Sequence, residues 1–279
     1  MSDSHARTLT ARRHKHDFAR PARRLLLAFY SLAVLAFLVL PMLIVIPMAF
    51  SSASSLTFPP PGLSLRWFET LFTDQAWRTA LLNSLLIALS ASTLSLIVGS
   101  LAAYGLVRHR PLGRSLVEAN FVAPLILPSV VLSVALYIVF SRLGVLGTFS
   151  GIVLGHTILC APYIVILLTV AIRSFDERIE LVAATLGASQ TRILLQIVAP
   201  NVWPSILAAW LFAFITSFDE VIVTLFISGK HMTIPKKMFN ELVMQINPTI
   251  TAVATLLIIL SVAVLCIAAL LIGRKTIAR

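Results

Sequence analysis

Length, composition and charge together exclude an ordinary water-soluble domain. Of the 279 residues, 58% are hydrophobic and only 12% are charged, whereas a soluble domain carries roughly 25% charged residues. The net charge of +11 would suit nucleic-acid binding. The basic residues are nevertheless spread as a membrane topology requires, so we expect no nucleic-acid partner.

Six long apolar runs divide the chain. Each reaches the roughly 20 residues with which a helix crosses the hydrocarbon core of a bilayer. The sequence therefore predicts an all-α membrane protein with six transmembrane helices, the first of which is tilted or kinked at Pro41 and Pro47. The runs cover residues 25–50, 80–107, 121–140, 149–172, 202–227 and 250–272.

The segments outside these runs alternate in basic character. In chain order, the first, third, fifth and seventh segments hold 16 Lys and Arg residues, and the other three hold 6. Positively charged segments stay in the cytoplasm, so both termini are expected there, with basic tails at 1–24 and 274–279 and lipid around the runs. His14 and His16 in the first tail are too few for a metal site, and no metal is expected.

The segment 51–79 is predicted to lie outside. After a Pro-rich turn, apolar residues recur at helical spacing, which indicates a short amphipathic helix in the membrane interface. Trp67 is of the type that anchors a helix at that depth. Alternatively, its ring offers a cation-π surface to a substrate at the entry of the path. The apolar positions are Leu65, Phe68, Leu71 and Phe72.

The segment 174–203 is predicted to face the cytoplasm and to form a helix, a tight turn and a second helix. Strong helix formers run from Glu180 to Leu186, and Gly187 stands where a helix stops or turns. Ser189 is a suitable cap for the second helix, and Pro200 is expected to end it.

This pattern resembles the cytoplasmic loop of binding-protein-dependent ABC importer permeases. That loop has a Glu-Ala-Ala triplet, a Gly after three further residues, and then Ile-x-Leu-Pro. Gly187 sets the register here, which places Ala183 at the second Ala and brings Ile197 and Pro200 to the Ile and Pro. Leu181, Val182 and Ala199 depart from the pattern, and Glu180 is the nearby carboxylate able to substitute for the usual acid.

The resemblance implies the type I ABC importer permease fold and a role for the loop in coupling. The first short helix would insert into a groove of a cytoplasmic ATPase, and the motion of an ATPase dimer would reach the spans on either side. Ala183 and Ala184 would permit close approach, and Gly187 the sharp turn. The alternative is a plain helical hairpin between two spans.

Further partners follow from the same resemblance. A second permease, related or identical, would complete the substrate path, two ATPase copies would dock inside, and a periplasmic binding protein would deliver substrate. The bacterial inner membrane is the expected location. The Gly229-Lys230 pair has Thr224 where a phosphate-binding loop requires its first Gly, so ATP and Mg²⁺ are assigned to the partner ATPase, with no cofactor on this chain and no enzyme activity of its own.

The wider chain is similar to permeases of the spermidine/putrescine class from about residue 83 to residue 272. The most specific segment is SFDEV at 217–221, and INPTI at 246–250 agrees. This resemblance places the transmembrane core of the importer at 80–273 and suggests a polyamine substrate.

Asp219 and Glu220 are the two acids inside an apolar run. A carboxylate at the centre of a span costs about 2.5 to 3.5 kcal/mol on insertion scales, and ammonium groups of a substrate would compensate it. We expect Asp219 to be the principal cation contact and Glu220 a second contact or a helix-packing partner, both on one helix about 100° apart. Alternatively, the acids pair with a partner subunit, with Arg142 or with Lys230.

The substrate class stays open at one position. Polyamine permeases often carry an acid directly after the Pro of the third span, whereas Ser129 follows Pro128 here. Ser129 is therefore a substrate-path candidate, and it leaves open a solute with fewer positive charges, such as an opine or an aminobutyrate-like zwitterion. For His156, an interhelical hydrogen bond is favoured over a proton relay.

Two other protein classes compete with the importer. A secondary transporter driven by an ion gradient would show inverted repeats with paired broken helices, and none is evident. A membrane enzyme would need a nucleophile-base set, a metal cluster or a phosphate loop, and the sequence offers none. Cys160 and Cys266 have no ligand or redox spacing and are expected to be small packing residues.

Overall fold

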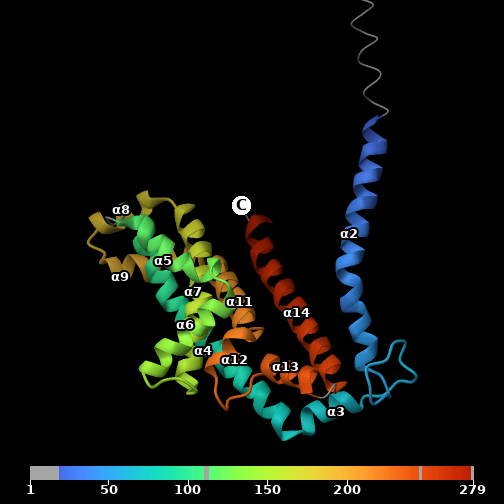
Figure 1. Cartoon of the computed structure of the whole chain (residues 1–279). Coiled ribbons are helices and arrows are strands. Elements are labelled where there is room, and N and C mark those ends of the chain that lie inside the picture. Colours follow the sequence, from blue (N-terminus) through green and yellow to red (C-terminus); the bar gives the residue numbers. More distant parts are fainter. Residues whose placement is uncertain (1–18, 110–112, 245–246, 278–279) are drawn as a thin grey trace, which may run out of the picture.

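The computed structural model describes residues 19–109, 113–244 and 247–277. Of the predicted tails at 1–24 and 274–279, residues 1–18 and 278–279 lie outside the described residues, whereas 19–24 and 274–277 belong to helices. Within them, helices joined by short loops make up the fold, and the strand-like pairing is a lone antiparallel bridge between Ser51 and Leu63. The expected all-helical fold is confirmed (Figure 1).

The helices follow the apolar runs, with additional short helices between them. In chain order they are α2 Ala19–Ala49, α3 Arg66–Thr73, α4 Gln75–Arg108, α5 Arg114–Ile126, α6 Ser129–Arg142, α7 Phe149–Arg173, α8 Glu177–Thr185, α9 Gln190–Ile193, the π-helical turn η1 Leu194–Val198, α10 Ala199–Asn201, α11 Trp203–Phe218, α12 Ile222–Ile227, α13 Ile234–Met244 and α14 Thr249–Ile277.

Three helices are long and apolar enough to cross a membrane, namely α2 from Arg24, α4 and α7. Counting each of two bent helix pairs as one span raises the number to five, and α14 adds a further helix whose apolar part is described over Thr249–Ala263. Each predicted run is thus helical, but the count of six spans stays a prediction.

Two of the predicted spans are broken helices. The third run bends by 109° between α5 and α6, because Leu127 before Pro128 is held in an extended conformation with ψ of 138°. The fifth run stops at Phe218 and resumes as α12 at Ile222. The expectation of one continuous helix in each place was therefore wrong.

The helices pack around a core that joins α4, α7 and α11. Its buried residues include Ala103, Cys160, Ile164, Ala209 and Ala213, where small side chains let the helices approach closely. Helix α2 stands to one side and contacts mainly α14 (Figure 1), and its residues from Leu25 to Met42 are exposed in the isolated chain.

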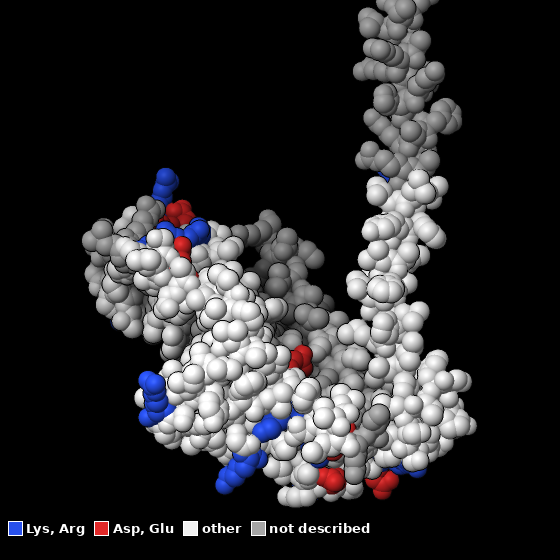
Figure 2. All heavy atoms as spheres, in the orientation of Figure 1, with Lys and Arg blue, Asp and Glu red and all other residues white. Residues whose placement is uncertain are grey.

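The two ends of the bundle differ in what they carry. The start of α2, α8, α9 and the C-terminal end of α14 lie at one end, and α3 and α13 lie at the other (Figure 1). Charged side chains gather mainly over α8 and around α3 and α13, with a broad, nearly uncharged band between (Figure 2). Such a band suits a bilayer, and the side on which each end lies stays a prediction.

The predicted amphipathic helix is confirmed as α3. Leu71 is buried beside Trp77 and Val253, while Leu65 and Phe72 remain exposed. The Arg66 guanidinium lies 4.1 Å from the centre of the Trp67 ring. One face of that ring is therefore already occupied by a cation from the same chain, which weakens Trp67 as a substrate surface.

Candidate functional site

The predicted helix, turn and helix between the fourth and fifth runs are present. Asp176 caps α8 by accepting from the Arg178 N–H at 2.9 Å. Gly187 has φ of 86°, and the Ala188 N–H donates to the Ala183 carbonyl at 3.0 Å. This is a Schellman ending, whose left-handed position favours Gly. The first helix runs over Glu177–Thr185 instead of starting at Glu180.

The second helix of the loop begins as predicted and ends differently. Ser189 caps it by accepting from the Arg192 N–H at 3.4 Å. Pro200 does not end the helix, because the chain widens into the π turn η1 and continues through α10 to Asn201. There it bends by 82° into α11. The predicted stop at Pro200 was therefore wrong by one residue, since the helix ends at Asn201. The widened turn before Pro200 tolerates the proline.

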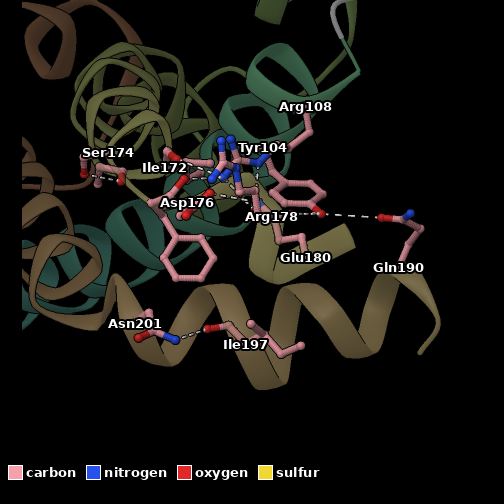
Figure 3. A network of polar contacts seen from close by, with 12 residues as sticks. Tyr104, Arg108, Ile172, Ser174, Asp176, Arg178, Glu180, Gln190, Ile197 and Asn201 are labelled. Atoms are coloured by element: carbon pink, nitrogen blue, oxygen red, sulfur yellow. Dashed lines mark hydrogen bonds and ion pairs between the residues drawn. The ribbon is translucent and has the colours of Figure 1, made fainter. Parts of the chain in front are cut away.

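Glu180 joins α8 to the transmembrane helices. Its Oε1 lies 2.6 Å from Arg108 Nη2 and accepts from Arg108 Nε at 2.8 Å, and its Oε2 accepts from the Tyr104 hydroxyl at 2.9 Å. Arg108 Nη2 also donates to the carbonyls of Ile172 and Phe175. We call Tyr104, Arg108 and Glu180 the loop clamp (Figure 3).

The loop clamp fixes α8 to two long helices at once. Tyr104 and Arg108 lie one turn apart near the end of α4, and Ile172 lies in the last turn of α7. The side chains of Arg108 and Glu180 are 10% and 8% exposed, so the charge-assisted bonds are shielded from water. The Glu180 carboxylate is therefore turned inward, toward α4 and the end of α7.

Apolar residues are exposed in the second half of α8 and at its C-cap, after the charged first turn with Glu177 and Arg178. Leu181 and Val182 are 60% and 59% exposed, and Leu186 is 83% exposed. Of the small residues, Ala183 packs against the core together with Ile197, while Ala184 is exposed. The predicted coupling residues thus divide into an inner set that holds the loop and an outer set that is free to contact another protein.

Asp219 and Glu220 lie in the gap between α11 and α12, which we call the acid break (219–221). Asp219 ends α11, is exposed, and lines a small cleft with Phe218, Leu257 and Ser261. Glu220 Oε1 accepts from the Val223 N–H at 2.9 Å and so caps α12. The acids are thus not 100° apart on one helix, as expected: they occupy a break whose polar backbone they help to satisfy.

Neither expected intramolecular partner pairs with these acids. Among the ion pairs of the described residues, none joins Asp219 or Glu220 to Arg142 or Lys230. The Asp219 side chain therefore remains available in this chain, while Glu220 is partly used as a cap.

His156 makes the interhelical hydrogen bonds that were favoured for it. Its Nδ1 lies 2.9 Å from Ser217 Oγ, and its Nε2 lies 2.9 Å from Thr224 Oγ1. Ser217 belongs to α11 and Thr224 to α12, so His156 contacts both sides of the acid break. Sequence reasoning missed these two partners, because nothing local to Ser217 or Thr224 indicates a residue 61 or 68 positions away.

Two further polar residues lie on α6 and α13. Ser129 is the first residue of α6, exposed at the bend, and its carbonyl accepts from the Ser133 hydroxyl. Lys236 is buried, and its Nζ donates to Ser228 Oγ at 2.7 Å and to the Gly229 carbonyl at 2.8 Å. Burial lowers the pKa of this ammonium, which is placed where the carbonyl end of α12 favours a cation.

No group of three or more His, Cys, Asp or Glu side chains is arranged to hold a metal ion among the described residues. Residues 95–277 match the family described as "Binding-protein-dependent transport system inner membrane component". The chain belongs to this family. Its loop clamp and acid break both lie within the matched residues.

The relatives of this permease agree with the family. It is 32% identical over 247 residues to "Spermidine/putrescine transport system permease protein PotC" of Haemophilus influenzae, covering 88% of this chain and 95% of that protein. It is 34% identical over 230 residues to "Putrescine transport system permease protein PotI" of Escherichia coli, covering 80% and 82%.

Solved structures of the same fold are more distant in sequence. The permease aligns with a chain of a bacterial ABC transporter that imports the acidic polysaccharide alginate, with a TM-score of 0.67 at 18% identity over 94% of this chain and 97% of that one. It also aligns with a chain of the MetNI methionine ABC transporter, with a TM-score of 0.60 at 17% identity over 74% and 97%. These matches establish the ABC importer permease fold.

Proposed function

We propose that this permease imports a polyamine, such as putrescine or spermidine, across the bacterial inner membrane, and that a separate ATPase drives it through α8. The observation that carries the substrate class is an exposed carboxylate, Asp219, held in a helix break within a span. Membrane carboxylates need compensation, and an ammonium group of the substrate supplies it. The names of the relatives support the same class.

The proposed roles of the two acids differ because their surroundings differ. Asp219 is exposed toward a cleft between α11 and α14, so both of its oxygens are free to accept from an ammonium. Glu220 has one oxygen engaged by the Val223 N–H. Asp219 is therefore the principal contact, and Glu220 the second.

The proposed coupling route begins at the exposed apolar residues in the second half of α8 and at its C-cap. Leu181, Val182 and Leu186 would be removed from water by the groove of an ATPase. The loop clamp would then carry a displacement of α8 to the ends of α4 and α7, since Glu180 is bonded to α4 and Arg108 is bonded to the end of α7. ATP and Mg²⁺ would bind the ATPase, and this chain would hydrolyse nothing.

The remaining partners follow from the same proposal. A second permease, related or identical, would close the acid break into a path, two ATPase copies would engage two loops, and a periplasmic binding protein would deliver the solute at the end that carries α3 and α13. Both termini would be cytoplasmic. One alternative has a specific observation in its favour: because Ser129 follows Pro128, an opine or aminobutyrate-like solute with fewer positive charges would fit the same acids.

The substrate role is tested in the reconstituted importer with labelled putrescine. Asp219→Asn keeps the shape of the side chain and removes its charge. We expect uptake efficiency to fall roughly tenfold or more, in line with the loss of a charge-assisted hydrogen bond. Glu69→Gln, an exposed acid on α3, is the control and should have no effect. Unchanged putrescine uptake by Asp219→Asn would remove the cation-contact role.

The docking role is tested by co-purification of the ATPase. Leu186→Arg places a charge on the exposed face of α8, and Leu63→Arg changes an equally exposed leucine near the opposite end, at 82% against 83% exposure. We expect the ATPase to be lost from the first variant and retained by the second. Equal retention by both would show that the ATPase docks elsewhere.

A further inference from the structure

We propose that His156 is a positioning residue for the acid break: it holds the end of α11 and the start of α12 on α7, and thereby sets where Asp219 and Glu220 meet a cationic substrate. This inference rests on the proposed function only in assuming that the acids contact a cationic substrate. The positioning itself rests on contacts, and the two are tested separately below.

The hydrogen bonds around His156 have one consistent direction. Thr224 Oγ1 donates its single hydrogen to the Glu220 carbonyl at 3.0 Å, because a carbonyl oxygen only accepts. Toward His156 the same hydroxyl must therefore accept, so the hydrogen of the neutral imidazole is on Nε2. Nδ1 is then the acceptor, and the Ser217 hydroxyl donates to it. This assignment follows from the hydrogen-bond network.

The result is a continuous relay of hydrogen bonds from α11 to the acid break. It runs from Ser217 to His156, from His156 to Thr224, and from Thr224 to the backbone of Glu220. All three side chains are buried, at 4%, 1% and 0% exposure, so water does not compete for these bonds. Loss of one member would leave a buried polar group without its partner.

The surrounding packing makes α7 a firm base for this relay. A Cβ at Gly155 would collide with the Ile227 side chain, so α12 lies directly against α7 at that point. One turn after His156, Cys160 Sγ lies 3.3 Å from the Ala213 carbonyl of α11. Val223 and Ile227 of α12 are also buried among Leu132, Leu136 and Phe140 of α6.

The acid break has few other constraints of its own. The gap contains no Pro or Gly to fix its backbone. Its remaining polar contacts among the described residues are the Asp219 N–H to the Ile215 carbonyl, the Val223 N–H to Glu220 Oε1 and the Leu225 N–H to the Val221 carbonyl. Each of these lies on one side of the break. The relay through His156 is the described polar contact that spans it, which is why we assign the positioning role to His156.

The test uses Thr224→Val, which matches threonine in shape and removes the hydroxyl, with Thr224→Ser as the variant that keeps it. The first readout measures geometry without any substrate: Asp219→Cys is labelled with a cationic methanethiosulfonate reagent in the assembled importer, in a Cys266→Ser background. Cys160 is buried. We expect Thr224→Val to change the labelling rate roughly tenfold, as for a lost buried hydrogen bond, and Thr224→Ser to leave it unchanged.

The second readout is labelled putrescine uptake per inserted importer, in a double-mutant cycle with Asp219→Asn. If the relay acts through the acids, Thr224→Val lowers uptake efficiency in the native background and has little further effect beside Asp219→Asn. A structural role alone gives the same factor in both backgrounds. His156→Leu should behave as Thr224→Val, and His156→Gln, which keeps a donor and an acceptor, should recover part of the uptake.

The outcomes separate the two proposals. An unchanged labelling rate in Thr224→Val overturns the positioning role, whatever the uptake result. The same uptake factor in both backgrounds, where Asp219→Asn itself impairs uptake, also overturns the action of His156 on the acids. A changed labelling rate together with normal putrescine uptake by Asp219→Asn supports the positioning role and contradicts the proposed substrate contact instead.

Discussion

The loop clamp and the acid break both hold helices together through buried polar groups. The groups of the loop clamp are ionised, whereas those that span the acid break are neutral. In the loop clamp, Arg108 at the end of α4 pairs with Glu180, whereas the break is spanned by hydroxyls and an imidazole. Ionised groups are expensive near the middle of a bilayer unless they are compensated. A neutral relay there adds no charge beside Asp219, the side chain that we propose as the principal substrate contact.

This difference predicts how each region fails. Removing one member of a buried ion pair leaves an uncompensated charge, which costs about 3 to 5 kcal/mol. Removing one member of a neutral hydrogen bond costs about 1 to 3 kcal/mol. Changes at the loop clamp should therefore affect stability and assembly more than equivalent changes beside the acid break.

The largest effect is expected for Arg108→Met. It leaves the Glu180 carboxylate buried without its cation, and we expect destabilisation of about 3 to 5 kcal/mol, seen as unfolding at lower SDS fraction in mixed micelles and as loss of the ATPase from the purified complex. Arg114→Met, which breaks the more exposed pair with Glu118, is the control and should cost less than about 1 kcal/mol. Adding Glu180→Met to Arg108→Met should recover stability. If it does not, the pair is not the cause.

Tyr104→Phe is next in expected size. It deletes the hydroxyl that donates to Glu180 Oε2, and a hydrogen bond to an ionised group contributes about 1.5 to 3 kcal/mol. The same unfolding titration measures it, with Tyr137→Phe, a tyrosine that is 46% exposed, as the matched control. Equal stability of the two variants would contradict the ionised clamp.

Gly187→Val addresses the turn of the loop. At φ of 86° a side chain with a Cβ is strained by roughly 1 to 2 kcal/mol, so α8 should lose its orientation while membrane insertion continues. The measurement is ATPase stimulation by transport substrate in the reconstituted importer. Gly105→Ala, where an added Cβ meets nothing within 4 Å, should be neutral. Normal stimulation by Gly187→Val would remove the turn from the coupling route.

Ser217→Ala gives the smallest effect and sharpens the comparison. It deletes a hydroxyl that donates to a neutral imidazole, where a typical net contribution is about 1 kcal/mol. The loss of stability that the unfolding titration measures for Ser217→Ala should be smaller than that for Tyr104→Phe, which deletes a hydroxyl beside an ionised group. The reverse order would mean that the charge difference between the two regions does not govern their stability.

Local features of the sequence predicted local structure well. Gly187 and Ser189 mark the turn and the cap of the loop because their effects act within three or four residues. The apolar runs identified the helices for the same reason. Pro128 carried the signal for the bend between α5 and α6, since the residue before a proline is pushed toward an extended conformation, although run length alone suggested one helix.

What the sequence could not supply depends on distant contacts. Glu180 is 76 residues from Tyr104 and 72 from Arg108 along the chain, so its inward direction required the packed fold. The break after Phe218 has no Pro or Gly to announce it, and two adjacent acids in an apolar run were its visible trace. The hydrogen-bonding role of His156 followed from its type, but its partners did not.

The central claim, an importer permease driven by a separate ATPase, is tested most directly by reconstitution. Proteoliposomes are prepared with this permease, its partner permease, the ATPase and the binding protein, and labelled putrescine uptake is measured with and without ATP. We predict uptake that requires ATP and disappears when the ATPase is omitted. Putrescine uptake by the permease without the ATPase, driven by an ion gradient, would contradict the account.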